Sequence, residues 1–301
     1  MSDAILNILK SSKYATGIDI SVHNDTFDLD VAEYASVMDI VDIIILRAGV
    51  GLQSGEVAED AKFAEFYTEL EQHPQALRGA YWYLSSHSSW QSQRDKFLNI
   101  LKGKDVDLIV VDVEKYYNVS SRAFALDAVK ILQSVQSEYP NKRVMLYTGK
   151  YIYQDWLKPH TDAVDSWPLW HAQYGWSTWN VLPWLVDSLV AWITKLFGGT
   201  LRPSLPASRG VDDWELWQVG DKTGLAKALG VGGTEIDINI SRRTREEFIK
   251  WIGRPARWDL PIEPDPIPDP IPDPIQIPDP EITVVRDSDN LHIHIHFHQE
   301  Q

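Results

Sequence analysis

The 301-residue sequence has no cysteine, only three methionines, and no apolar run long enough to cross a bilayer. Without cysteine there is no disulfide framework, no thiolate metal site and no cysteine nucleophile. The most apolar stretch, residues 181–197, is interrupted by Pro183, Asp187 and Lys195, which excludes a membrane anchor. The N-terminus lacks the basic start and long apolar run of a secretory signal, so we expect a short lead-in helix over residues 1–13.

Basic residues are also scarce. The chain has 28 Lys and Arg against 43 Asp and Glu, a net charge of −15. Binding to DNA or RNA requires clustered Lys and Arg, so nucleic acid is excluded as a partner. From Arg254 onward there are three basic and ten acidic residues, a net charge of −7, which leaves −8 for residues 1–253. Residues 1–253 are therefore only mildly acidic, whereas the last 48 residues carry nearly half of the net charge.

Proline marks the boundary between these parts, because ten of the 17 prolines lie between Pro255 and Pro280. Proline at nearly every second position excludes helix and sheet and favours polyproline II, a semi-rigid spacer of roughly 50 Å over residues 264–280. We therefore expect a linker over residues 254–281 and a small β module over residues 282–301. Within that module, residues 282–286 and 291–298 are predicted to form a hairpin.

The last predicted strand alternates histidine with apolar residues. In a strand, one face then carries His292, His294, His296 and His298, and the other carries Leu, Ile and Phe. We interpret the module as a hairpin that packs on its apolar side or pairs with another chain. The alternative is metal-dependent oligomerisation through the histidines. Either would suit a homo-oligomer or attachment to a virion.

Residues 14–253 alternate short β-branched runs with amphipathic segments, the pattern of strand–helix units around a parallel sheet. Helical patterns cover residues 58–73, 90–101 and 122–138. The eight predicted strands are residues 14–21, 41–49, 77–84, 107–114, 143–149, 168–174, 214–219 and 235–240. This pattern predicts an α/β fold, an irregular barrel of the TIM type. Its second half is expected to be less regular, because only residues 221–229 separate the last two strands.

A forty-residue excursion, residues 175–213, interrupts the barrel pattern and contains four tryptophans. A structureless loop of this length is unusual in a compact domain, so we expect a helix over residues 183–197. A packed local insertion is the favoured interpretation, and a lid or membrane-surface helix is the alternative.

Acidic residues stand at the C-terminal ends of predicted strands, where barrel enzymes place their active sites. Asp112 and Glu114 are two apart on one apolar strand, so they share a face, with Cα atoms roughly 6.6 Å apart. Burying an unpaired carboxylate is costly unless its pKa shifts or partners satisfy it, and such a cost usually implies a use. The alternative is a structural salt bridge to Arg47. Asp19 and Asp237 end two other strands, where a lone aspartate is more often a turn former or helix cap.

Paired carboxylates framed by aromatic residues suggest glycoside hydrolysis, in which one acid protonates the leaving oxygen and another carboxylate stabilises the cationic sugar. The histidines show neither a serine-triad nor a zinc-ligand pattern, so no metal or cofactor is expected. Aromatic rings stack on sugars, although half of these would serve as barrel core. The candidates are Tyr81, Tyr83, Tyr147, Trp170, Tyr174 and Trp217.

Eight short motifs occur in one order: Gly17-Ile-Asp-Ile-Ser21, Ile45-Leu-Arg-Ala-Gly49, Gly79-Ala-Tyr-Trp-Tyr83, Val111-Asp-Val-Glu114, Leu146-Tyr-Thr148, Leu169-Trp-His-Ala-Gln-Tyr174, Leu216-Trp-Gln218 and Ile236-Asp-Ile-Asn239. Over residues 14–252 the chain thereby resembles the family 25 glycoside hydrolases, which are lysozymes of phages, bacteria and fungi. The resemblance implies a (β/α)5(β)3 barrel. It also implies cleavage of the β-1,4 bond between N-acetylmuramic acid and N-acetylglucosamine in the glycan strands of peptidoglycan.

The resemblance further implies roles for the site residues. Glu114 corresponds to the general acid, Asp112 to the residue that orients the substrate's N-acetyl group, and Tyr147 to a residue that positions it. Asp19 and Asp237 correspond to acids that raise the pKa of Glu114. Arg47 joins the aromatic residues as a substrate contact. The sequence leaves open which aspartate assists Glu114.

Some positions depart from the family pattern. Phe66 stands where the helix after the second strand usually has Asn, and His171 stands where an apolar residue is common. All four acids are nevertheless present. The alternative function is a non-catalytic wall-binding or virion component built on the same barrel. Without a secretory signal, the protein is expected in the host cytoplasm before lysis or on a virion, and in both cases it acts on the bacterial wall.

Overall fold

The structure is a computed structural model that describes residues 12–29, 41–73, 76–115, 120–173, 203, 205–210, 212–220, 226, 229–233 and 235–253, and the backbone of 281–286 and 291–296. The chain divides into two compact units, Met1–Ala256 and Arg257–Gln301. The predicted lead-in helix, the helix over residues 183–197 and the proline-rich linker lie outside the described residues. In the described part, no helix is long and apolar enough to cross a membrane.

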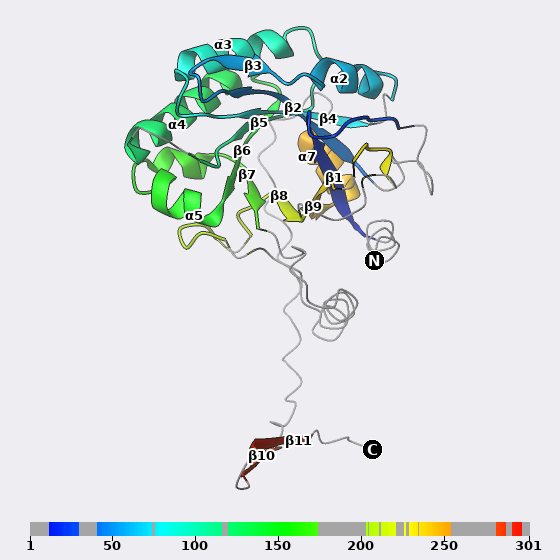
Figure 1. Ribbon diagram of the computed structural model, residues 1–301, viewed down its shortest axis with the longest axis vertical. Helices are drawn as coiled ribbons and strands as arrows, with labels where there is room; N and C mark the ends of the chain where they lie inside the picture. The colour runs from blue at the N-terminus through cyan, green and yellow to red at the C-terminus, as the bar shows by residue number, and fades with distance from the viewer. Residues whose placement is uncertain are drawn as a thin grey trace. The chain divides into compact units, whose positions relative to one another are not determined.

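The first unit is a closed barrel of eight strands (Figure 1). Strand β1 pairs with both β2 and β9, which closes the sheet. The pairs are parallel except at β9, which runs antiparallel to β1 and β8. The strands are β1 (Tyr14–Ile20), β2 (Ile43–Gly51), β4 (Leu77–Tyr83), β5 (Leu108–Asp112), β6 (Arg143–Gly149), β7 (Leu169–Ala172), β8 (Leu216–Gly220) and β9 (Asp237–Thr244). The predicted irregular barrel is confirmed.

The strands bury both faces, which explains their runs of β-branched residues. On β5, Leu108 and Val110 belong to the cluster inside the barrel, whereas Ile109 and Val111 belong to the cluster between the sheet and the helices. The other strands alternate in the same way. A residue's parity along its strand therefore decides whether it faces the barrel interior or the surrounding helices.

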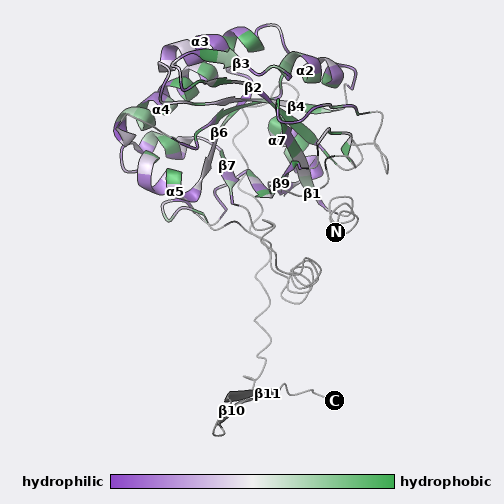
Figure 2. Ribbon diagram, in the orientation of Figure 1, coloured by the Kyte–Doolittle hydropathy of each residue, from purple (hydrophilic) through white to green (hydrophobic). Residues whose placement is uncertain are grey.

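Helices cover the outside of the barrel and are hydrophobic on the side toward the sheet (Figures 1 and 2). They are α2 (Phe63–Glu71), α3 (Trp90–Leu101), α4 (Ser121–Glu138) and the short α5 (Lys150–Ile152), which continues into a π-helical turn (Tyr153–Leu157) and a 3-10 turn (Asp162–Ser166). The Ser89 hydroxyl caps α3, and the Ser120 hydroxyl caps α4. Each satisfies a backbone N–H that the first turn leaves unpaired.

One end of the barrel is closed by α7 (Arg245–Ile252). Phe248 and Ile252 pack in the interior cluster against residues at the starts of the strands, such as Leu77 and Leu108. The helix begins with a capping box between Thr244 and Glu247. Because α7 closes the N-terminal ends of the parallel strands, a site inside the barrel opens at their C-terminal ends.

The structure corrects one prediction about the first helix. The predicted helix over residues 58–73 begins only at Phe63, because β3 (Val57–Glu59) pairs antiparallel with the end of β2. Gly49 permits this pairing, since a Cβ atom there would lie 2.4 Å from the Ala58 carbonyl oxygen. The approach of two backbones overrides the helical pattern.

The second unit contains β10 (Glu281–Arg286) and β11 (Leu291–His296), which pair antiparallel as predicted. Val284 lies opposite Ile293, and Thr283 lies opposite His294. The register therefore places His292, His294 and His296 on one face of the hairpin, and Leu291, Ile293 and Ile295 on the other.

Candidate active site

The predicted site residues converge at the C-terminal ends of the strands. Five of these residues follow a residue on the interior face of the same strand by two or four positions, so they lie on that face too. They are Asp19, Arg47, Tyr81, Asp112 and Tyr147. The side chains also influence one another electrostatically, because Tyr81 lies within range of Asp19, Arg47, Asp112 and Asp237. Six different strands therefore contribute to this single cluster of ionisable side chains.

Asp112 is the most strongly perturbed acid in this cluster. Its side chain is buried, with 4% exposed, and Oδ1 has no hydrogen-bond partner among the described residues. Burial raises the pKa of Asp112 well above its ordinary value, and the charges of Glu114 and Asp19 raise it further. Arg47 acts in the opposite direction.

Glu114 follows β5 by two residues and is less enclosed than Asp112. Burial raises the pKa of Glu114, and the charge of Asp19 raises it further, while Lys115 lowers it. The hydrogen bond with the Tyr147 hydroxyl also lowers the pKa of Glu114. The two carboxyl groups of Asp112 and Glu114 interact, so they titrate as a pair and hold protons to higher pH than isolated acids.

Asp19 lies opposite Asp237 in the register between β1 and β9. Asp19 Oδ2 accepts hydrogen bonds from Gln218 Nε2 at 3.0 Å and from Asn239 Nδ2 at 2.8 Å. Burial raises the pKa of Asp19, whereas hydrogen bonds with Asn239, Gln218 and Asp237 lower it. Asp19 is therefore held by side-chain partners rather than by a turn or a helix cap.

Arg47 forms its salt bridge with Asp60, with Nε 2.7 Å from Oδ2. Asp60 also accepts hydrogen bonds from the backbone N–H groups of Val22 and Lys62. The alternative of a structural salt bridge between Arg47 and the pair Asp112 and Glu114 is therefore not observed. The guanidinium still lowers the pKa of Asp112 from a distance.

Several predicted aromatic contacts gather beside the acids. Trp170 packs against Tyr147, with ring centroids 4.6 Å apart, and against Tyr81 at 6.4 Å. Tyr83 is half-buried and is paired in register with Asp112. Tyr147 and Trp170 are buried, so neither presents an open ring face to a ligand.

Of the other two predicted aromatic contacts, only Trp217 is described, and it is not brought into the cluster. Trp217 has the opposite parity on β8 and packs with Trp214 in the outer cluster, where its Nε1 donates to the Gln173 carbonyl oxygen at 2.8 Å. Tyr174 lies outside the described residues. A substrate contact by either residue stays a prediction.

Two buried amides, Gln218 and Asn239, belong to the site although the sequence analysis did not select them. Both bond Asp19, and Gln218 also accepts a hydrogen bond from the Tyr147 hydroxyl at 2.7 Å. Their parity was a usable signal, because Gln218 follows the interior residue Leu216 by two positions and Asn239 follows Asp237 by two.

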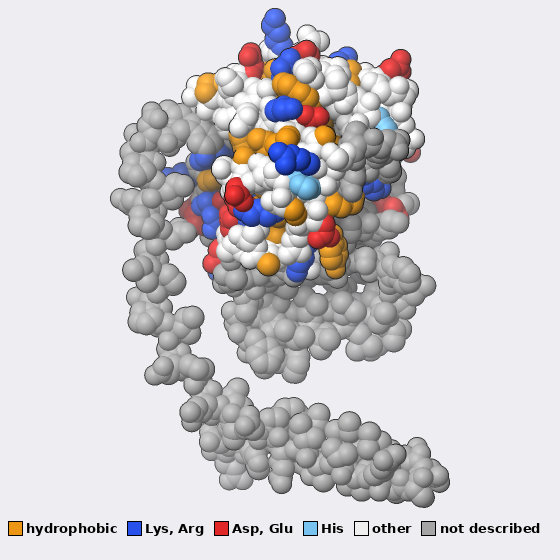
Figure 3. Space-filling model, turned by 90° about the vertical axis from the view of Figure 1, so that its left-hand side faces the viewer, with side chains coloured by type: hydrophobic (Ala, Val, Ile, Leu, Met, Phe, Trp, Pro, Cys, Tyr) orange, Lys and Arg blue, Asp and Glu red, His pale blue; other side chains and the backbone are white. Residues whose placement is uncertain are grey.

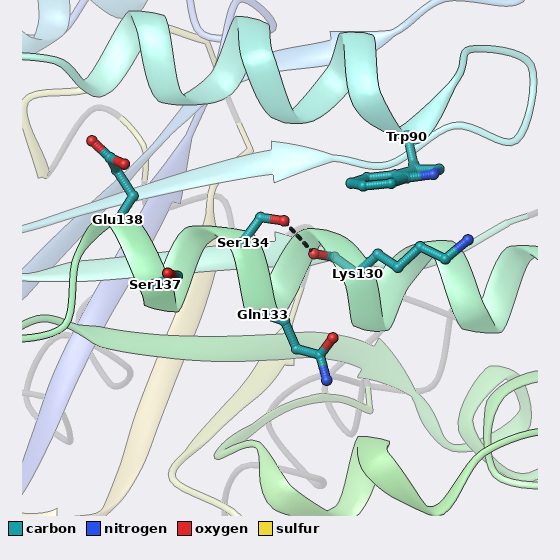
Figure 4. A pocket seen from close by; sticks show the side chains of 6 residues that line it. All are labelled: Trp90, Lys130, Gln133, Ser134, Ser137 and Glu138. Atoms are coloured by element: carbon teal, nitrogen blue, oxygen red, sulfur yellow. Dashed lines mark hydrogen bonds between the residues drawn. The ribbon is translucent and has the colours of Figure 1, made fainter.

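A separate hollow of about 450 Å³ lies between α3 and α4, with Trp90 above α4 (Figure 4). It contains one acid, Glu138, and the Trp90 ring already contacts Arg94 at 5.0 Å and Lys130 at 5.4 Å. On the face shown in Figure 3, positive and negative side chains are interspersed, as on an ordinary solvated surface. This hollow therefore lacks the paired carboxylates found at the barrel end.

In the residues that the structure describes, no three His, Asp or Glu side chains are grouped so that they could hold a metal ion. The chemistry open to the cluster is proton transfer and electrostatic stabilisation by carboxyl groups.

Comparison with known families decides the class of enzyme. The model of the glycosyl hydrolases family 25 matches residues 18–224, which is more than half of the chain. The chain belongs to glycosyl hydrolase family 25. The resemblance drawn from the eight motifs is confirmed, and so is the prediction that the protein is a glycoside hydrolase. The matched region contains Asp19, Asp112 and Glu114.

Solved structures of glycosyl hydrolases and muramidases share the fold of this chain. The enzyme of Bacillus anthracis aligns with a TM-score of 0.58 at 20% identity, over 79% of this chain and 94% of that chain. A muramidase from Acremonium alcalophilum aligns with a TM-score of 0.54 at 18% identity, over 79% of this chain and 98% of that chain. A lysozyme from Aspergillus fumigatus aligns with a TM-score of 0.53 at 18% identity, over 78% of this chain and 97% of that chain. No curated protein sequence matches the chain.

Proposed function

We propose that this family 25 glycosyl hydrolase is a lysozyme that cleaves the β-1,4 bond between N-acetylmuramic acid and N-acetylglucosamine in peptidoglycan. The observation that carries the proposal is the interacting pair Asp112 and Glu114, with raised pKa values, at the open end of the barrel. A carboxyl group that keeps its proton near neutral pH is what a general acid requires. The names of the fungal relatives, a muramidase and a lysozyme, support the choice of substrate.

In the proposed mechanism, Glu114 donates its proton to the glycosidic oxygen. The bond between that oxygen and the anomeric carbon breaks, and its electron pair leaves with the departing sugar. Asp112 orients the substrate's acetamido group, whose oxygen attacks the anomeric carbon. The Glu114 carboxylate then takes a proton from the water that opens the cyclic intermediate. Each proton that Glu114 loses is thereby restored.

The surrounding residues have supporting roles in this proposal. The charges of Asp19 and Asp237 hold the pKa of the pair high, as the effect of Asp19 on both acids supports. Tyr147 positions the acetamido group. Further contacts with the glycan are assigned to Arg47, Tyr81, Tyr83, Trp170, Tyr174 and Trp217.

The test compares the protein with its Glu114→Gln variant on purified cell walls. Without its acid, the variant is expected to lose about 10²- to 10⁴-fold in the rate of clearing and of release of new reducing ends. Glu138→Gln, the same substitution on the exposed side of α4, is the matched control and keeps full activity. Muropeptide analysis identifies the bond, because a muramidase leaves N-acetylmuramic acid at the new reducing end.

The outcomes separate the proposal from its alternative. Equal clearing by the protein and by Glu114→Gln contradicts the assignment of the acid. Binding to walls without any released fragment favours a non-catalytic wall-binding protein built on the same barrel.

A further inference from the structure

Arg47 is a positive group inside the acid cluster, and its salt bridge is with Asp60. We propose that Asp60 is a positioning residue of the reaction, which holds Arg47 and so prevents the guanidinium from forming an ion pair with Asp112. The inference rests on the proposed function, because it explains how Asp112 keeps an oxygen for the acetamido group of the substrate.

Arg47 and Asp112 are complementary groups that do not bond to each other. Asp112 is 4% exposed, and its Oδ1 has no hydrogen-bond partner among the described residues. Burial raises the pKa of Asp112, and Arg47 is near enough to oppose this rise. The bond from Arg47 to Asp60 uses Nε, which leaves the two terminal amino groups of the guanidinium for other partners. An ion pair would satisfy the buried oxygen of Asp112, so its absence needs a cause.

The strand order brings the two side chains within reach of each other. Strand β2 pairs with β4, and β4 pairs with β5, so residues in register on β2 and β5 lie about 10 Å apart. Arg47 and Asp112 both face the barrel interior, because each follows an interior residue, Ile45 or Val110, by two positions. The long arginine side chain can therefore approach Asp112 across the barrel interior.

Asp60 is itself fixed by the backbone around it. Its Oδ1 accepts the N–H of Lys62 at 2.9 Å, and its Oδ2 accepts the N–H of Val22 at 3.1 Å. Its own N–H donates to the Ala48 carbonyl oxygen at 3.0 Å. The Asp60 side chain is 1% exposed, so it is held in place and cannot follow Arg47 toward the acids.

The two carboxyl groups compete for one guanidinium, and Asp60 has the advantage. Two backbone N–H groups stabilise the negative charge of Asp60. At Asp112, burial and the charges of Glu114 and Asp19 oppose a negative charge. Arg47 Nε accordingly lies 2.7 Å from Asp60 Oδ2. Asp112 is left without a bound cation, and its Oδ1 can accept the N–H of the acetamido group.

The other ionisable groups near this contact are the same in every variant of the test. Around Asp112 they are Asp19 on β1, Tyr81 on β4, Glu114 and Lys115 after β5, Tyr147 on β6 and Asp237 on β9. Beside Asp60, Lys62 is paired with Glu65. Substitutions at Asp60 and Arg47 alter none of these, so they isolate the contact between the two residues.

The test is a double-mutant cycle of Asp60→Asn and Arg47→Met, with kcat and KM measured on a soluble peptidoglycan fragment. Asp60→Asn releases the guanidinium to Asp112 and should lower kcat by about 10- to 100-fold. Arg47→Met removes a predicted glycan contact and should mainly raise KM. In the double variant no guanidinium can reach Asp112, so kcat should recover to within about three-fold of the value for Arg47→Met.

This recovery is the result that a merely structural role of Asp60 does not produce. A double variant that is no faster than Asp60→Asn overturns the proposal, because Asp60 then acts only on the backbone that it binds. If Asp60→Asn does not fold, Asp60→Ser takes its place in the cycle, because a serine hydroxyl can still accept the N–H of Lys62.

Asp107→Asn is the matched control. Asp107 is also a buried aspartate, 3% exposed, and it accepts a backbone N–H, that of Arg78, at 2.9 Å. It directly precedes β5 and therefore lies at the closed end of the barrel. Its substitution should lower the melting temperature without changing kcat or KM.

Titration of Asp112 by carbon-13 NMR tests the same contact without turnover. A guanidinium that moves closer favours the charged carboxylate, so the pKa of Asp112 should fall in Asp60→Asn and rise again in the double variant. If the protein cleaves no wall but the pKa follows this pattern, the proposed function fails and the hold of Asp60 on Arg47 stands. If the pKa of Asp112 does not fall in Asp60→Asn, the proposal fails whatever the activity.

Discussion

Asp112 combines features that oppose stability. It is buried, one of its oxygens has no partner among the described residues, and neighbouring acids raise its pKa. A carboxyl whose pKa is raised on folding stabilises the fold when protonated and destabilises it when ionised. The acid cluster is therefore expected to lower the free energy of unfolding of the barrel at neutral pH, as catalytic groups often do.

We predict that Asp112→Asn raises the melting temperature at pH 7 while it reduces hydrolysis. The native state binds a proton at Asp112 more tightly than the unfolded chain does. This contribution to stability is complete below the ordinary value of 3.8 and is lost as the pH rises through the raised value. Asparagine does not ionise, so the free energy of unfolding of Asp112→Asn is expected to exceed that of the protein by about 0.5–2 kcal/mol at pH 7 and by almost nothing below pH 4.

Calorimetry at both pH values measures this difference. Asp95→Asn, a substitution on a side chain that is 65% exposed, is the control and should change the melting temperature little at either pH. A variant of Asp112 that melts lower than the protein at pH 7 would contradict the account of a strained acid.

At the scale of elements, α7 determines which end of the barrel is open. Phe248 is fully buried and stacks on Trp251, with ring centroids 5.9 Å apart, below the strand starts. We predict that Phe248→Ala destabilises the protein by about 3–5 kcal/mol, because it leaves a cavity in the interior cluster. The acids lie at the other end, so the fraction that stays folded should keep the pH profile of the protein.

Denaturant unfolding tests this prediction, with Ile249→Ala as the control on the same helix. Ile249 is 45% exposed, and its truncation should cost about 0.5 kcal/mol or less. Similar losses for the two variants would mean that α7 does not close the interior cluster.

The strands of the barrel could be predicted from sequence because burial on both faces leaves continuous apolar runs. Residues 143–149 and 90–101 have the predicted bounds as β6 and α3. The strand β3 could not be predicted, because it depends on a close backbone approach between Gly49 and Ala58 that the helical pattern does not indicate. Phe66, which departs from the family pattern, is explained only in the structure, where it packs against Phe27 at 5.6 Å.

In the candidate site, the sequence predicts that the acids converge, but it does not predict which side chains form hydrogen bonds and salt bridges there. Parity places Asp19 and Asp112 inside the barrel, and the same rule excludes Trp217 from the interior. The bond between Arg47 and Asp60 joins a strand to a helix start, and no periodicity indicates it. Gln218 reaches Asp19 across 199 positions of sequence, and only closure of the sheet brings them together.

At the scale of the whole molecule, the acidic character is divided between two parts of the sequence. The net charge of −15 is almost evenly split between residues 1–253 and the last 48 residues, at −8 and −7. The acidic, proline-rich composition of residues 254–281 predicts a spacer between the barrel and the hairpin.

The register of the hairpin places Ile282, Val284, Leu291, Ile293 and Ile295 on one face, together with Arg286 at its end. An isolated two-stranded hairpin is marginally stable in water, so it needs a partner for this mainly apolar face. We predict that the full chain assembles through this face, whereas a chain that ends at Gly253 is monomeric with unchanged activity on soluble fragments.

Light scattering measures the mass of both, with and without chelator. Ile293→Asp should abolish assembly, and the matched change on the other face, His294→Asp, should not. Assembly that a chelator reverses would instead assign the contact to the histidines, and a monomeric full chain would exclude the hairpin as an assembly module.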